Sequence, residues 1–316
     1  MAPNSFYTPR EAALVTANLA NDDAFLSALV SRNFANDLMA GGKGGAPVAV
    51  KMPTTLIARN RGTDDVVSPI VLDSIAEQTV TVTLSRVHDY SAVGLSEADL
   101  TLKIEDFSAQ VLKPQAEAIV DSLEHKVATL LRGVPETASV AYSAANPVKT
   151  FTAIRKLLRD NGVAVSGINA IVGTQVFADL LDAEALTDAS KSGSTAALRE
   201  GSIGNLRGMT IVESTRLDES EIIVFHRDAV TLVTRAPVVP QGAPFGATVS
   251  EKGFSLRYVR DYDASVMQDR SVVSTFSGVA ILPTYKVERN YDTRAVSVTA
   301  LPNGGIVRIL TDTVPV

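Results

Sequence analysis

The strongest hydrophobic pattern in the chain lies between Glu105 and Arg132. Apolar residues recur there at Leu112, Ala116, Ile119, Leu123, Val127 and Leu130. Spacings of three and four residues place such side chains on one face of an α-helix, so one long helix is predicted. Pro114 interrupts the pattern, and the helix is expected to begin or bend there because proline lacks a backbone N–H. Gly133 and Pro135 are expected to end it.

The polar positions of this predicted helix are unusual because three acidic residues share one side. Glu117, Asp121 and Glu124 stand at positions i, i+4 and i+7. Like charges at such spacings repel by roughly 0.2–0.5 kcal/mol per pair. Lys113 can relieve Glu117, whereas little in the same helix relieves Asp121. One interpretation is a solvated acidic face, and the other is that a basic element of another subunit lies along it.

Two shorter helices are predicted near the N-terminus. Thr8, Pro9 and Glu11 form a helix start, with a capping side chain, a proline in the first turn and the glutamate of a capping box. A second helix is expected to open at Asp22 and Asp23. Its apolar stripe would be Phe25, Leu26, Leu29, Val30, Phe34 and Leu38.

The hydrophobic period changes to two after Pro47. Val48, Val50 and Met52 alternate with other residues, and Val80, Val82 and Leu84 alternate with threonines. Such alternation predicts two β-strands. The connection between them, Leu56–Ser74, is long and charged and carries Arg59 and Arg61. A two-stranded hairpin cannot bury both of its faces alone, so this one is expected to project and to lie on another surface.

Helical and strand patterns alternate after Gly133. Helices are predicted from Asn146-Pro147 to Asn161-Gly162 and over Val176–Leu186, and strands over Ile168–Val172, Met209–Val212, Ile222–Phe225 and Ala229–Val233. This alternation predicts a compact α/β lobe. Thr187–Thr195 is polar and rich in serine and glycine, which is typical of an exposed, mobile loop.

The last part of the chain is mostly strand-like. Strands are predicted over Phe254–Val259, Val272–Leu282 and Ala295–Leu301. Asn303-Gly304-Gly305 has the composition of a hairpin turn, so Ala295–Leu301 and Ile306–Leu310 are expected to pair with each other.

Composition removes several classes of function. The 316 residues include no cysteine, which excludes disulfides, iron–sulfur clusters, thiolate zinc sites and cysteine nucleophiles. A net charge of −6 argues against holding nucleic acid by a basic surface, although not against enclosing it. No secretory signal pattern is present, and no run approaches the roughly 18 apolar residues of a membrane span. We therefore expect a soluble protein, cytoplasmic when made.

Catalytic and metal-binding patterns are also missing. The three histidines, His88, His125 and His226, are scattered without metal-ligand spacing. Gly201-Ser202-Ile203-Gly204 is no nucleophile elbow, because Glu200 stands where that motif needs glycine. The carboxylates of Asp261-Tyr262-Asp263 are expected to be solvated or capping. The sequence predicts no enzyme, no cofactor and no metal.

Several short motifs follow one another in a recognisable order. They are Ile104-Glu105-Asp106-Phe107-Ser108, Val111-Leu112-Lys113-Pro114, Ala197-Leu198-Arg199-Glu200-Gly201, Ile203-Gly204, Leu206-Arg207-Gly208, Phe225-His226-Arg227-Asp228-Ala229-Val230, Phe254-Ser255-Leu256-Arg257-Tyr258 and Asp261-Tyr262-Asp263. Together with the order of the predicted elements, they resemble a tailed-bacteriophage major capsid protein of the Hong Kong 97-like fold. The nearest resemblance is to the coat-protein group of short-tailed enterobacterial phages and their actinobacterial-phage relatives. It covers roughly residues 1–285.

The resemblance implies an α+β fold with named parts. They are an N-terminal arm, 1–46, an extended β-hairpin called the E-loop, 47–85, a P-domain, 86–145, with a spine helix at 105–132, an α/β A-domain, 146–245, and returning P-domain strands with a C-terminal hairpin, 246–316. The hairpin, at about 295–312, lies outside the match.

The same resemblance implies a major capsid protein without an active site. Copies of the chain would form pentamers and hexamers that close into an icosahedral shell around the double-stranded DNA genome of a tailed phage. Implied partners are the chain itself, a separate scaffolding protein, a portal protein, packaged DNA without sequence-specific contact, and a decoration protein. The protein would assemble in the host cytoplasm and reside in the virion. The alternatives are an encapsulin-like nanocompartment shell and, more remotely, a soluble α+β enzyme.

Three further expectations follow from the resemblance. Because the capping box begins at Thr8, no cleaved N-terminal scaffolding segment fits, and assembly is expected to need another protein or a fused route without a protease. The type member of the fold joins an E-loop lysine to a neighbouring asparagine, but no lysine lies between Met52 and Leu102, so this crosslink is not expected. Finally, the hairpin-tip residues Arg59 and Arg61 are expected to contact Glu117, Asp121 and Glu124 of a neighbouring subunit.

Overall fold

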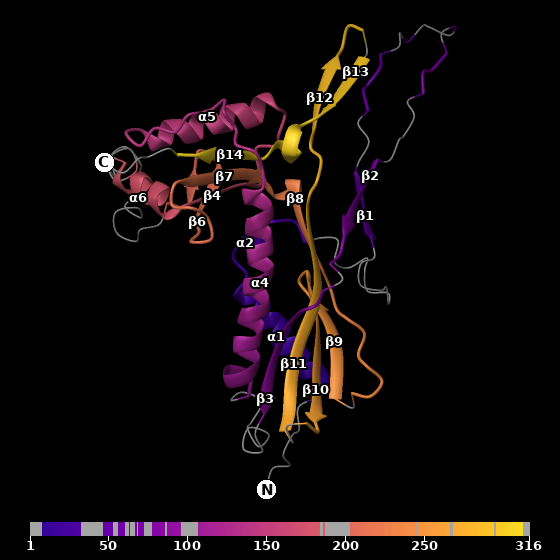
Figure 1. The fold of residues 1–316 in the computed structure, drawn as a ribbon. Coiled ribbons are helices and arrows are strands. Elements are labelled where there is room, and N and C mark those ends of the chain that lie inside the picture. Colours follow the sequence, from indigo (N-terminus) through magenta and orange to yellow (C-terminus); the bar gives the residue numbers. More distant parts are fainter. Residues whose placement is uncertain are drawn as a thin grey trace. The chain divides into compact units, whose positions relative to one another are not determined.

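A computed structural model describes residues 8–32, 47–52, 56–60, 63, 67, 69–72, 78–85, 87–95, 107–183, 186, 203–243, 245–265, 268–293 and 295–311. The chain divides into two compact units. The first comprises Met1–Val48, Val82–Leu131 and Val230–Ala280, and the second comprises Ala49–Thr81, Arg132–Ala229 and Ile281–Val316. Helices and strands are mixed in both units (Figure 1), so the predicted α+β class is confirmed.

The long helix of the first unit is α4 (Lys113–Arg132), and a π-helical turn, Ser108–Leu112, leads into it. The Lys113 N–H donates to the Ser108 carbonyl, five residues back. Pro114 has no N–H to donate, and its ring would crowd the carbonyl four residues earlier. The wider π turn accommodates this ring. The predicted interruption at Pro114 is therefore confirmed.

A five-stranded sheet accompanies α4 in the first unit. Its order is β3 (Asp89–Leu95), β11 (Gln268–Ile281), β10 (Phe254–Asp263) and β9 (Phe245–Glu251), and β8 (Val230–Arg235) also pairs with β11. Within the order β3-β11-β10-β9, neighbouring strands run antiparallel. Gln115 of α4 is buried, and its amide donates to the carbonyls of Ser91 and Ser271. These bonds join one face of the helix to β3 and β11. The sequence patterns did not predict β3 or β9.

The first N-terminal helix is confirmed and the second is wrong. α1 (Pro9–Asp22) begins with the predicted capping box between Thr8 and Glu11 and packs against β9 and β10. α2 covers only Leu26–Leu29. Ser31 is instead extended and forms a parallel bridge with Thr231. The Ser31 N–H donates to the Val230 carbonyl, and the Leu232 N–H donates to the Ser31 carbonyl. These hydrogen bonds to β8 take the place of the continued helix that the apolar stripe predicted. Phe34 and Leu38 lie outside the described residues.

The predicted hairpin strands are present. β1 (Pro47–Met52) and β2 (Gln78–Thr83) pair in a two-stranded sheet. They correspond closely to the two alternating patterns of the sequence.

The second unit contains a mixed five-stranded sheet in the order β14-β7-β4-β6-β5. β4 (Ile168–Val172) runs parallel to β6 (Met209–Glu213) and antiparallel to β7 (Glu221–His226), while β5 (Asn205–Leu206) and β14 (Val307–Leu310) form the two edges. α5 (Pro147–Asp160) and α6 (Thr174–Asp182) pack on one face (Figure 1). Apolar side chains from both helices and from alternate strand positions form one core, including Phe151, Ile154, Leu158, Val176, Leu180, Ala170, Val224 and Ile309. The predicted α/β lobe is thus present, but the strand predicted over Ala229–Val233 is β8, which belongs to the sheet of the first unit.

The predicted C-terminal hairpin is wrong. β13 (Ala295–Ala300) pairs antiparallel with β12 (Tyr285–Asn290), and β14 pairs with β7. The expected turn does form, with positive φ angles of 51° at Asn303 and 65° at Gly304. A Cβ at Gly304 would lie 2.5 Å from the Leu282 carbonyl, so this turn is packed against the preceding chain. It directs β14 into the sheet of the α/β lobe instead of back along β13.

Candidate assembly surfaces

Two of the three acidic residues singled out on α4 are exposed. Glu117 and Asp121 both lie on the outer side of the helix. The Glu117 carboxylate is 3.8 Å from the Lys113 ammonium, which is the relief that the sequence predicted. Glu117 and Asp121 therefore form an exposed acidic pair that another subunit could contact.

Glu124 does not belong to this exposed side, and its prediction is corrected. Its side chain is buried, with the residue 5% exposed, and one carboxylate oxygen accepts the N–H groups of Phe25 at 2.5 Å and Leu26 at 3.0 Å. These N–H groups start α2, where helices leave donors without internal partners and favour negative charge. Glu124 follows Leu123 and precedes Val127 by three residues, so helical rotation turns it toward the buried side.

The connection after β1 exposes both charge and apolar side chains. Arg59 is exposed, whereas Arg61 lies outside the described residues. Exposed apolar side chains in the described part of this connection are Leu56, Val67, Ile70, Val71 and Leu72. Leu72 is 87% exposed. Clustered exposure of this kind is typical of a surface that a partner covers.

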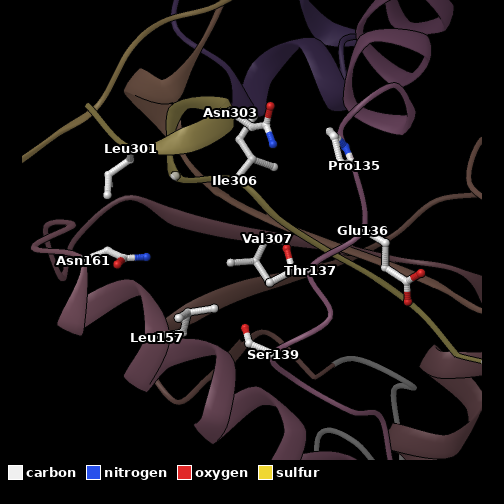
Figure 2. Close-up of a pocket in the computed structure, with 11 residues that line it drawn as sticks. Pro135, Glu136, Thr137, Ser139, Leu157, Asn161, Leu301, Asn303, Ile306 and Val307 are labelled. Carbon is white, nitrogen blue, oxygen red and sulfur yellow. The ribbon is translucent and has the colours of Figure 1, made fainter. Parts of the chain in front are cut away.

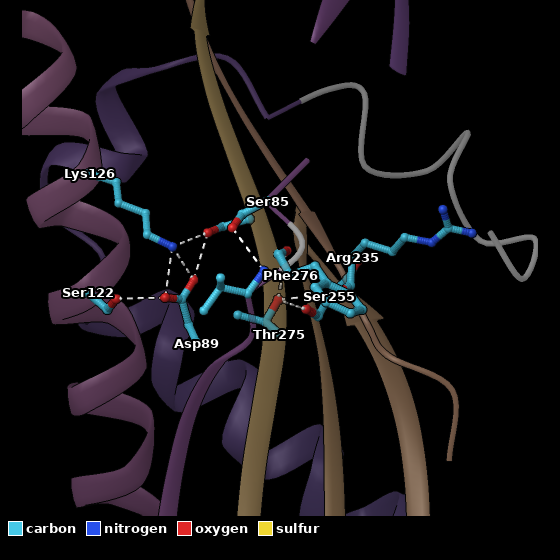
Figure 3. Close-up of polar contacts among 10 residues, drawn as sticks. Ser85, Asp89, Ser122, Lys126, Arg235, Ser255, Thr275 and Phe276 are labelled. Carbon is cyan, nitrogen blue, oxygen red and sulfur yellow. Dashed lines mark hydrogen bonds and ion pairs between the residues drawn. The ribbon is translucent and has the colours of Figure 1, made fainter. Parts of the chain in front are cut away.

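A charged cluster links α4 to the sheet of the first unit (Figure 3). The Lys126 ammonium lies 2.7 Å and 2.5 Å from the two oxygens of the Asp89 carboxylate. The hydroxyls of Ser122 and Ser277 also donate to Asp89. Burial raises the pKa of Asp89, but the hydrogen bonds from Lys126 and Ser277 outweigh it and hold the pKa below its usual value. The cluster therefore joins α4, β3 and β11 through one ionised carboxylate.

A second buried carboxylate organises the lobe, and the sequence patterns did not reveal it. Glu221, at the start of β7, is completely buried. One of its oxygens is 2.6 Å from Nε of Arg308, and the other is 3.2 Å from Nε of Arg132. Arg308 also donates to the Val134 carbonyl, and Arg132 pairs with Asp218 at 2.6 Å. The sequence did contain a signal for this buried carboxylate, because Glu221 directly precedes the apolar run Ile222–Phe225. A charge buried beside such a strand requires oppositely charged partners.

A cavity of about 350 Å³ opens beside the end of α5 (Figure 2). Its lining residues are Pro135, Glu136, Thr137, Ser139, Leu157, Asn161, Leu301, Asn303, Gly305, Ile306 and Val307. Glu136 is the one titratable side chain among them. The lining holds neither a histidine nor a lysine that could work with this carboxylate, so the cavity contains no acid–base pair for catalysis.

His88 and His226 have structural roles, and Asp261 and Asp263 lie on β10 in ion pairs, so the expectation that these carboxylates are solvated or capping is corrected. The His88 ring packs on Phe276, with centroids 4.1 Å apart, and the His226 ring bonds to the Ser166 carbonyl at 2.9 Å. Both aspartates bind Arg270, at 2.7 Å and 2.9 Å.

Neither a metal-binding cluster nor a membrane-spanning helix is found in the described part of the chain. Within them, no group of histidine, aspartate or glutamate side chains could hold a metal ion. Among the helices of that same part of the chain, none has the length and apolar character needed to cross a membrane.

The fold is shared with solved phage structures. A chain from Mycobacterium phage Che8 matches with a TM-score of 0.55 and 18% identity, over 90% of both chains. The capsid of Ralstonia phage GP4 matches with a TM-score of 0.53 and 8% identity, over 91% of this chain and 88% of the other. The capsid structure of cyanophage P-SCSP1u matches with a TM-score of 0.53 and 11% identity, over 85% and 84%. The protein therefore has the Hong Kong 97-like capsid fold.

The sequence itself places the chain in a family. A family model described as "Phage capsid protein" matches residues 97–275, more than half of the chain, and the chain belongs to this family. No curated protein matches it. It is a capsid protein, a structural component of the virion that forms a shell of identical subunits, and not an enzyme. The encapsulin-like alternative is weaker, since the family matched is that of phage capsids.

Proposed function

We propose that the chain assembles as pentamers and hexamers into an icosahedral shell enclosing the double-stranded DNA of a tailed phage. The match to the phage capsid family over residues 97–275 is the observation that carries this proposal. Closed rings require contacts between two different surfaces of each subunit. In this proposal 1–46 is the N-terminal arm and 47–85 the E-loop. The P-domain contains α4, and the lobe with α5 and α6 is the A-domain.

The partners of such a shell are proposed from the same resemblance. A separate scaffolding protein would act during assembly in the host cytoplasm, and a portal protein would be a further partner of the shell. Packaged DNA would be enclosed without sequence-specific contact, and a decoration protein would bind the finished shell.

Addition of a purified scaffolding protein should increase the yield of regular shells. Equal yields of uniform shells with and without it, at physiological salt, would remove the scaffold from the proposal.

One inter-subunit contact is proposed in residue detail. Arg59 and Arg61 of one subunit would lie against Glu117 and Asp121 of a neighbour. The exposure of Arg59, Glu117 and Asp121 and their opposite charges support it. Glu124 is not included because it is buried and bound to the start of α2.

Particle size provides the test of the overall proposal. The full chain, expressed with and without a candidate scaffolding protein, would be examined by light scattering and electron microscopy. Closed shells of megadalton mass built from the 33.4 kDa subunit are expected. A uniform small oligomer under every condition would contradict the proposal. Shells that hold an enzyme and no DNA would favour the encapsulin-like alternative.

A further inference from the structure

The outer side of α5 carries a concentration of positive charge. Lys149, Arg155, Lys156 and Arg159 lie on this helix, with Asp160 as its one acidic residue. The chain as a whole has a net charge of −6. The α5 face, defined as these four cations, is therefore a local exception to the charge of the protein.

The cations of the α5 face are bound by carbonyl oxygens or remain exposed, as far as the structure describes the lobe. Arg155 donates to the Arg207 carbonyl, and Arg159 donates to the Val163 carbonyl at 2.6 Å. Among the residues that the structure describes, none of the four cations forms an ion pair with a carboxylate. The arginines Arg132 and Arg308 of the same unit, by contrast, both pair with Glu221.

The two arginines of the α5 face are held by backbone carbonyls while keeping donors to spare. A guanidinium has five N–H donors in a planar fork, so one bond to a carbonyl leaves several for another acceptor. Holding the group in place also lowers the entropy lost when it binds an anion. Lys149 and Lys156 add two mobile point charges on the exposed side.

The dimensions and composition of the α5 face favour a phosphate backbone as its partner. From Lys149 to Arg159 the helix rises about 15 Å at 1.5 Å per residue. Duplex DNA carries one charge per roughly 1.7 Å of axis, so a segment of that length presents about nine phosphates. The exposed residues between the cations are the small Thr152 and Ala153. Protein–protein interface cores are instead aromatic and poor in lysine, while protein–DNA interfaces are strongly positive.

We propose that the α5 face is a sequence-independent contact surface for the phosphate backbone of nucleic acid. The inference rests on the proposed function, in which the shell encloses DNA. Contact through phosphates alone fixes no sequence and remains reversible, as a packaged genome requires. The net charge of −6 disfavours such binding by the subunit as a whole, so a local basic surface is needed for it.

Direct binding measurements test the proposal. The full chain would be titrated with a labelled duplex of arbitrary sequence, and affinity measured by fluorescence anisotropy over a range of salt concentrations. The variant Lys149→Gln with Lys156→Gln removes two exposed charges without touching the bonds of Arg155 and Arg159. Its affinity should fall, and the slope of log affinity against log salt should become shallower by about two. The control, Arg227→Gln with Lys252→Gln, removes the same charge from exposed positions elsewhere and should bind like the wild type.

Three results would overturn the proposal. They are absence of duplex binding by the wild type at low salt, equal weakening in the test and control variants, and lysine-dependent binding of polyglutamate in place of DNA. The last result would assign the α5 face to an acidic protein partner.

Electron microscopy of the same preparations separates this proposal from the proposed function of the chain. Wild-type chains that bind DNA through the α5 face but never form shells would contradict only the proposed function.

Discussion

At the scale of single residues, Glu124 shows how one carboxylate can connect distant parts of a unit. It stands on α4, yet its hydrogen bonds are made to the first N–H groups of α2, 98 and 99 positions away in sequence. An anion at that place satisfies donors that the short helix cannot satisfy itself. Its role is to stabilise the subunit, and it contributes nothing to the exposed acidic surface.

Replacement of Glu124 by alanine should destabilise the subunit by about 1–2 kcal/mol, because it removes a helix cap and leaves two N–H groups without their acceptor. Glu124→Gln keeps an acceptor oxygen and should cost less. Urea denaturation of the full chain measures both. Glu117→Gln, at an exposed position of the same helix, is the control and should stay within about 0.5 kcal/mol of the wild type. Equal effects at positions 117 and 124 would show that the cap contributes nothing.

Asp89 supplies a prediction about pH. Its pKa is depressed in the folded protein, so the stabilisation is present at neutral pH and is lost as pH falls through the folded pKa. That loss should occur below about pH 4, the ordinary range of an aspartate. Asp89→Asn should lower the stability at pH 7 by about 1.5–3 kcal/mol, the contribution of hydrogen bonds to a charged group.

The difference between Asp89→Asn and wild type should shrink as the pH is lowered below about 4, where the wild-type carboxylate also becomes neutral. Urea denaturation at neutral and acidic pH provides the measurement. A difference that stays constant with pH would mean that the ion pair with Lys126 is not its source.

The sequence predicted elements better than it predicted their partners. The 3.6-residue period identified α4, and the break at Pro114 follows from the missing N–H of proline. The same periodicity treats every carboxylate as an exposed polar residue, so it could not show that Glu124 is buried. Partners distant in sequence were equally hidden. The chain after α2 forms a bridge from Ser31 to Thr231, which lies 200 positions away in sequence.

At the scale of elements, β14 illustrates the same limit. Local turn chemistry at Asn303-Gly304 correctly predicted a turn, and hairpin statistics then favoured pairing with the preceding strand. The choice was decided by tertiary contacts, since β14 pairs with β7 and places Arg308 beside the buried Glu221. Such an ion pair is invisible to any reading of neighbouring residues.

Arg308→Gln should therefore destabilise the lobe strongly, by about 3 kcal/mol, since it leaves the Glu221 carboxylate with a single arginine, Arg132. The double variant with Glu221→Gln should lose less than the sum of the two single variants, because no unpaired charge then remains buried. Thermal and urea denaturation of the four proteins would form the cycle. Arg289→Gln, at an exposed strand position, is the control. Additive losses in the double variant would contradict the coupling.

At the scale of the whole molecule, a lysine-free stretch of the chain bears on how finished shells are held together. No lysine lies between Met52 and Leu102. Lys51, on β1, is the one lysine within 47–85. The lysine–asparagine crosslink of the type member should therefore not form through the connection between β1 and β2. Mature particles boiled in detergent should run as one band near 33.4 kDa. A ladder of covalent multimers in that gel would contradict the expectation.

Shell closure should instead depend on contacts that salt can weaken, and the proposed pairing of Arg59 and Arg61 with Glu117 and Asp121 is the most specific of these. Each exposed pair contributes only about 0.2–1 kcal/mol, but every subunit repeats it, and screening reduces it as ionic strength rises. Arg59→Glu with Arg61→Glu should impair assembly at low salt while leaving the circular dichroism and denaturation midpoint of the subunit unchanged. Adding Glu117→Lys with Asp121→Lys to the same chain should partly restore shells, because the two surfaces are again opposite in charge. Arg227→Glu with Lys252→Glu, which changes the net charge equally at other exposed positions, should assemble normally. Normal shells from the first double variant, or no rescue by the second pair, would reduce Glu117 and Asp121 to a solvated acidic face.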